Sequence, residues 1–169
     1  TGEADILCGM FYSPERGTQF EFTQPHTVVH YVPVVSSGVS PSSFFQLNGL
    51  TVSVQEGDIA HEYLLENHFT GEILACVSQE EALTLLLDGE CDCALVARLS
   101  AEHFRENRNS TIVIGDVPLL SPGYCFAVPS GEQALVAELS EGLRASVANG
   151  AYRRSFEKWM GNYIEDEPV

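Results

Sequence analysis

Residues 4–16 read ADILCGMFYSPER, and residues 20–25 read FEFTQP. The first run is apolar as far as Phe11 and then turns at Ser13 and Pro14, where the proline ring fixes the backbone. We predict a strand, a rigid turn that presents Arg16, and a second short strand. A guanidinium held in such a turn offers a preorganised fork for a carboxylate or another oxyanion. The alternative is a surface arginine paired with Glu15 or Glu21.

The composition describes a globular, strongly acidic chain. Its 169 residues are 44% hydrophobic, and 8 Lys and Arg stand against 24 Asp and Glu, which gives a formal charge of −16. Such a surface repels phosphate backbones and anionic headgroups, so we expect no nucleic-acid partner. No apolar stretch approaches the roughly 20 residues that a bilayer crossing needs. We therefore expect any signal peptide or membrane anchor to lie in segments outside this chain.

Cysteine and histidine give no sign of a metal site or a cofactor. The number of cysteines is odd, and none forms a zinc-type pair with two residues between. We predict that they are buried small residues, with one inter-strand disulfide left open. No cofactor is predicted. The cysteines are Cys8, Cys76, Cys91, Cys93 and Cys125, and the scattered histidines are His26, His30, His61, His68 and His103.

The middle of the chain alternates between strand and helix patterns. Asp58 can cap one helix, and Ser78 with Glu81 three residues later forms a capping box for the next. Such alternation predicts a parallel sheet with right-handed crossovers, which is one complete α/β lobe. The predicted strands cover residues 51–54, 73–77, 93–96 and 111–114, and the predicted helices cover residues 58–68, 78–88 and 100–107.

The two ends of the chain do not make a second complete lobe. Residues 1–28 predict two strands, and residues 124–161 predict a strand followed by two helices. Gly150 separates these helices as a C-terminal stop. We interpret Trp159 as a packing residue of the last helix.

Three runs together resemble the type II periplasmic solute-binding proteins of the polar-amino-acid class, known as bacterial extracellular solute-binding protein family 3. These runs are residues 4–25, residues 47–63 and residues 150–161, which include the KWMG sequence at residues 158–161. The resemblance implies an α/β fold of the Venus flytrap type, with two lobes joined by a hinge.

The resemblance also implies an assignment of segments to lobes. Residues 1–28 and 124–161 form lobe 1, residues 32–120 form lobe 2, and residues 162–169 form an acidic linker. We expect lobe 1 to be incomplete in this chain, because the first strands and helices of the family fold are absent. The chain would cross between lobes at residues 28–31 and 120–124.

The family resemblance supplies candidate ligand-binding residues. The arginine of its Ser/Thr-Pro-x-Arg turn pairs with a ligand carboxylate, which corresponds to Arg16, and Ser13 could add a hydroxyl donor. On lobe 2, Asp58 and Ile59 begin a helix whose backbone N–H groups can hold an anion, although we expect the Asp58 carboxylate to cap the helix itself. Amino-acid binders carry an aspartate where this sequence has Ala97.

The departures from the family pattern concern the ligand amine. Because Ala97 cannot pair with an ammonium, we expect a small anionic solute other than a standard α-amino acid. Phe11 likewise stands where such binders often carry a small hydroxyl residue. Tyr12, His26 and His61 could flank the cleft.

The sequences HEYL at residues 61–64 and FTQPHT at residues 22–27 resemble the periplasmic sensor domains of hybrid histidine kinases. The resemblance implies an extracytoplasmic sensor whose lobes close on the ligand, with kinase chemistry outside this chain, which itself is not an enzyme. A homodimer is compatible with it. The alternatives are a free periplasmic binding protein of an ABC importer and, less favoured, a relative of the dehydratases built on this fold.

Overall fold

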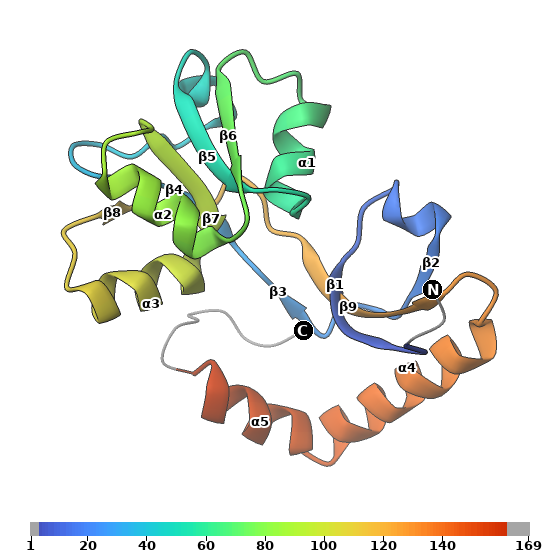
Figure 1. The fold of residues 1–169 in the computed structure, drawn as a ribbon. Coiled ribbons are helices and arrows are strands. Elements are labelled where there is room, and N and C mark those ends of the chain that lie inside the picture. Colours follow the sequence, from blue (N-terminus) through green and yellow to red (C-terminus); the bar gives the residue numbers. More distant parts are fainter. Residues whose placement is uncertain (1–3, 162–169) are drawn as a thin grey trace. The chain divides into compact units, whose positions relative to one another are not determined.

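The computed structural model describes residues 4–161, which form two compact units (Figure 1). The chain passes between the units twice, from Val29 to His30 and from Ser121 to Pro122, so that the first unit contains both ends and the second contains the middle. The predicted acidic linker at residues 162–169 lies outside the described residues.

The second unit is built on a five-stranded mixed sheet in the order β6-β5-β7-β4-β8. The strands that helices connect run parallel to one another, whereas β4 is antiparallel to both of its neighbours, β7 and β8. The prediction of an all-parallel sheet was therefore wrong, because it omitted β4, which no helical crossover precedes. The elements are β4 (Tyr31–Val35), η2 (Phe44–Leu47), β5 (Thr51–Gln55), α1 (Ile59–Glu66), β6 (Glu72–Cys76), α2 (Gln79–Leu87), β7 (Cys93–Ala97), α3 (Arg98–Arg108) and β8 (Val113–Ile114).

Strand β4 contains a proline although it lies inside the sheet. The carbonyl of Pro33 accepts a hydrogen bond from the N–H of Gly115 at 2.9 Å, but proline has no N–H to return to the facing strand. The carbonyl of Gly115 instead accepts a hydrogen bond from Arg98 Nη2 at 2.9 Å. A Cβ at Gly115 would lie 2.8 Å from the Pro33 carbonyl oxygen, so this close approach requires glycine.

Helices α1 and α2 of the second unit begin where their caps predict. The Asp58 side chain accepts a hydrogen bond from Ile59 N, and Ser78 accepts one from Glu81 N, which confirms both predicted caps. Helix α3 starts at Arg98, two residues earlier than predicted. Helices α2 and α3 cover a core cluster that includes Leu83, Leu86, Ala94, Val96 and Phe104.

The first unit is an antiparallel sheet with two helices. Strand β9 is central: β1 pairs along one edge of it, and β2 and β3 pair with successive parts of the opposite edge. Helix α4 contacts β9 and β2, and Gly150 with φ 75° ends it before α5 begins. The elements are β1 (Leu7–Phe11), η1 (Arg16–Thr18), β2 (Phe20–Phe22), β3 (Thr27–Val28), β9 (Gly123–Pro129), α4 (Gln133–Ala148) and α5 (Ala151–Trp159).

The interpretation of Trp159 as a packing residue was wrong, since 69% of its surface is exposed. Neither α4 nor α5 has a buried residue in the described chain, so the last helix offers no core for the indole to enter. The ring lies instead against the Nζ of Lys158, 4.7 Å from its centroid. Such a contact is a surface cation–π interaction.

Four of the five cysteines are buried as predicted, and the exception is Cys8, which is exposed on β1. All five are free thiols, so the inter-strand disulfide left open by the sequence is not formed. Burial raises the pKa of the Cys93 thiol to about 12, which keeps it neutral at any physiological pH. The buried cysteines therefore act as small apolar core residues.

Candidate functional site

Arg16 lies in a tight turn that follows β1 in the first unit. The buried Ser13 holds this turn: its Oγ accepts a hydrogen bond from the Arg16 N–H at 3.3 Å, and its carbonyl accepts one from the Gly17 N–H at 2.9 Å. Thr18 Oγ1 donates to the Glu15 carbonyl at 2.7 Å and closes the turn. The backbone of Arg16 is thus fixed by local hydrogen bonds.

The half-buried side chain of Arg16 returns toward the end of β1. Its Nη1 donates a hydrogen bond to the carbonyl of Phe11 at 3.3 Å. A guanidinium carries five N–H donors in a planar fork, so a backbone bond of this kind orients the group. The turn therefore presents a positioned cation at the carboxyl end of β1.

Aromatic rings follow the strand beside Arg16. The ring of Phe11 lies 4.6 Å from that of Tyr124 on β9, and His26 lies 5.6 Å from the same ring. A ring nitrogen of His26 is 3.3 Å from the Cys8 carbonyl, and the Tyr152 hydroxyl donates to the His26 carbonyl. Burial lowers the pKa of His26, which favours its neutral form.

Asp58 is the centre of a hydrogen-bonded group in the second unit. Its Oδ1 accepts from the Ile59 N–H at 2.8 Å and so caps α1. Its Oδ2 accepts from the Tyr31 hydroxyl at 2.7 Å and from Gln79 Nε2 at 3.0 Å. Three donors from three different elements therefore hold this carboxylate.

Gln79 connects Asp58 to the end of β7. While its Nε2 donates to Asp58, its Oε1 accepts from the Ala97 N–H at 3.1 Å. Ala97 itself is 7% exposed and offers only a methyl group beyond its backbone. The structure thus brings Asp58, Ile59 and Ala97 together in the second unit through Tyr31 and Gln79, whereas Phe11, Ser13 and Arg16 lie together in the first.

One protein-family model, that of the bacterial extracellular solute-binding proteins of family 3, matches residues 1–162. The chain belongs to this family.

Solved structures share the fold of this chain. A histidine kinase sensor domain with similarity to periplasmic binding proteins is 32% identical, with a TM-score of 0.88 over 95% of this chain and 71% of that one. The fold is that of the type II periplasmic binding proteins, as the sequence resemblance implied.

Two curated relatives are solute-binding proteins of ABC transporters. The ABC transporter arginine-binding protein 1 of Escherichia coli is 24% identical over 92% of this chain, and the glutamine-binding protein GlnH of Bacillus subtilis is 24% identical over 99%. The chain spans 65% and 60% of the lengths of these relatives, which is less than two thirds of either.

Sequence reasoning missed two members of the hydrogen-bonded group around Asp58 in the second unit. Tyr31 is separated from Asp58 by 27 positions and gives no local signal. Gln79 is separated from Asp58 by 21 positions, and its only sequence signal is its place directly after the cap residue Ser78. Of the two other flanking candidates, Tyr12 has 53% of its surface exposed. His61 has a local role, because its Nδ1 accepts a hydrogen bond from the Gly57 N–H.

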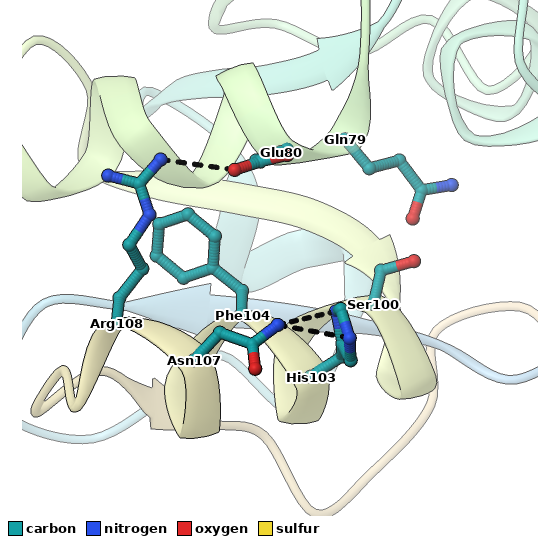
Figure 2. Close-up of a pocket in the computed structure, with 7 residues that line it drawn as sticks. All are labelled: Gln79, Glu80, Ser100, His103, Phe104, Asn107 and Arg108. Carbon is teal, nitrogen blue, oxygen red and sulfur yellow. Dashed lines mark hydrogen bonds and ion pairs between the residues drawn. The ribbon is translucent and has the colours of Figure 1, made fainter.

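A separate hollow lies between α2 and α3 in the second unit (Figure 2). Glu80 and Arg108 point toward one another in it, 3.0 Å apart, and Arg108 also lies over the Phe104 ring. The polar groups that line this hollow mostly bind one another, so we assign it no ligand. Its lining residues are Gln79, Glu80, Ser100, His103, Phe104, Asn107 and Arg108.

Residues 4–161 contain neither a metal-type cluster of side chains nor a helix able to span a membrane. In that part of the chain, no group of three or more His, Cys, Asp and Glu side chains is placed to hold a metal ion. None of the helices described there is long and apolar enough to span a bilayer.

Proposed function

We propose that this chain is the extracytoplasmic sensing domain of a membrane sensor histidine kinase, and that it binds a small anionic solute between its two lobes. The observation that carries the proposal is the 32% identity with a histidine kinase sensor domain over 95% of the chain, beside 24% identity with the two transport relatives. The absence of an amine-pairing carboxylate at Ala97 supports a ligand that differs from those of amino-acid transporters.

The proposed mechanism follows from a cation on one unit and a hydrogen-bonded group on the other. A solute whose carboxylate pairs with Arg16 while its other end meets the group around Asp58 binds the closed arrangement more tightly than the open one. Only such a difference in affinity can drive closure. In a receptor, closure would move the end of α5 and pass the signal to a following membrane helix.

A periplasmic binding protein that delivers solute to an ABC importer is the second candidate. The arginine-binding and glutamine-binding relatives favour it, since both are components of ABC transporters. Membership of an extracellular solute-binding family fits an extracytoplasmic location under either proposal.

A phosphorylation assay separates the two proposals. Membrane vesicles that contain the full-length protein are incubated with labelled ATP and with lactate, pyruvate, succinate or glutarate in turn. The sensor proposal predicts that at least one carboxylate changes autophosphorylation several-fold, and that the Arg144→Ala variant on α4 keeps this response. A protein that binds solute without any autophosphorylation would instead be the importer component.

A further inference from the structure

We propose that Asp58 determines specificity by occupying the anion site at the N-terminus of α1, so that lobe 2 rejects a second anionic group. The part of the solute that meets lobe 2 then bears no negative charge and carries O–H or N–H donors, such as hydroxyl or amide groups. The ligand class in this inference rests on the proposed function, whereas the experiment that tests the inference depends only on the second unit.

Three backbone donors at the start of α1, those of Gly57, Asp58 and Ile59, already have acceptors inside the unit. The Gly57 N–H donates to His61 Nδ1 at 3.2 Å, and the Asp58 N–H donates to the Gln55 carbonyl at 3.2 Å. The Ile59 N–H donates to Asp58 Oδ1 at 2.8 Å. An external anion would have to displace these partners, whereas an open helix N-terminus would hold it directly.

The Asp58 carboxylate is also prevented from moving away. Tyr31 is 1% exposed and donates to Oδ2, and Gln79 donates to the same oxygen while its own carbonyl is fixed by the Ala97 N–H. Gln79 Nε2 also lies 3.2 Å from the Tyr31 hydroxyl. Moving the carboxylate would therefore leave hydrogen-bond donors on two side chains without their acceptor.

These hydrogen bonds determine which polar atoms the group around Asp58 can present to a ligand. Gln79 Nε2 and the Tyr31 hydroxyl both donate to Asp58. The polar atoms of this group that can form additional hydrogen bonds are therefore oxygens that act as acceptors. A second carboxylate would meet a like charge, while a hydroxyl or an amide could donate to an oxygen. The inferred solute class is therefore a monocarboxylate whose other end bears hydrogen-bond donors and no second negative charge.

Removing the carboxylate should convert this group into an anion receptor. In Asp58→Gly, the Ile59 N–H, the Tyr31 hydroxyl and Gln79 Nε2 surround the space that the carboxylate has left. Acetate has the size and charge of the missing group, and hydrogen bonds to a charged group are stronger than those between neutral groups. Glycine is also an acceptable N-cap residue, so the substitution should leave α1 folded.

The test is an acetate titration of the full chain at constant ionic strength, followed by the Ile59 amide resonance in ¹⁵N–¹H spectra. We expect a saturable shift in Asp58→Gly at a concentration about tenfold or more below any effect on the wild type. Asp58→Asn, which keeps the shape without the charge, and Glu56→Gln, which removes a nearby exposed charge, should both behave as the wild type. Asp58→Ser is the second variant, because serine also caps helices well.

A saturable acetate shift at Ile59 in the wild type would overturn the inference, as would no shift in both Asp58→Gly and Asp58→Ser. Acetate binding by Asp58→Asn that is as strong as binding by Asp58→Gly would also overturn it. Loss of the negative charge alone would then be enough for an anion to bind. The titration reports on the second unit alone. Failure of the proposed function, in which no solute binds at Arg16, would leave this result unchanged.

Discussion

Arg16→Ala should weaken the binding of a carboxylate solute by about 30-fold or more, because truncating one partner of a buried charge pair typically costs 2 to 5 kcal/mol. The physical reason is the positioned guanidinium: the turn fixes the Arg16 backbone through Ser13, and the Phe11 carbonyl orients the side chain. A flexible surface arginine would contribute far less. Isothermal titration calorimetry on the full-length protein measures the change.

Two matched variants make the calorimetry specific. Arg144→Ala removes the same charge from an exposed position on α4 and should leave the affinity unchanged. Arg16→Lys keeps the charge but loses the planar fork, so it should bind with intermediate affinity. If Arg16→Ala retains wild-type affinity and melting temperature, Arg16 is a surface arginine and its assignment fails.

The second large effect concerns free α-amino acids, which should bind about 10- to 150-fold more weakly than carboxylates of the same length without the amine. An ammonium placed at the end of β7 would meet the Ala97 methyl group, and a charge-assisted hydrogen bond of about 1.5 to 3 kcal/mol would be missing. The Ala97 N–H donates to Gln79 Oε1, and the Ala97 side chain, a methyl group, has no acceptor to offer an ammonium.

A thermal-shift screen of the common amino acids beside simple carboxylates measures this difference. Ala97→Asp should raise the stabilisation by amino acids, because it restores a carboxylate at the position where amino-acid binders carry one. The contrary result is strong stabilisation of the wild type by an amino acid that disappears in Asp58→Asn. In that case Asp58 pairs with the ammonium, and the interpretation of Ala97 is wrong.

Local signals in the sequence were sufficient for most elements of the fold. Asp58 and Ser78 marked the starts of α1 and α2 because an N-cap satisfies backbone donors within a few residues of itself. Strand β4 was not predictable in this way. Its Pro33 argues against an inner strand, and the compensation comes from Arg98 and Gly115, far along the chain.

The same difference between local signals and tertiary packing applies to the residues of the candidate site. The turn around Arg16 could be predicted because Ser13, Pro14 and Arg16 act within four positions. Tyr31 and Gln79 could not, since their contacts with Asp58 depend on how β4, α1 and α2 pack. Tertiary packing, which no local pattern encodes, thus determines the chemical character of the second unit.

Closure on a solute is the central claim, and small-angle X-ray scattering of the full-length protein tests it most directly. Scattering is recorded without solute and with a carboxylate at a concentration that calorimetry has shown to saturate the protein. We predict that the radius of gyration falls on saturation, and that Arg16→Ala at the same concentration shows no change. An unchanged radius of gyration in the saturated wild-type protein would contradict the account.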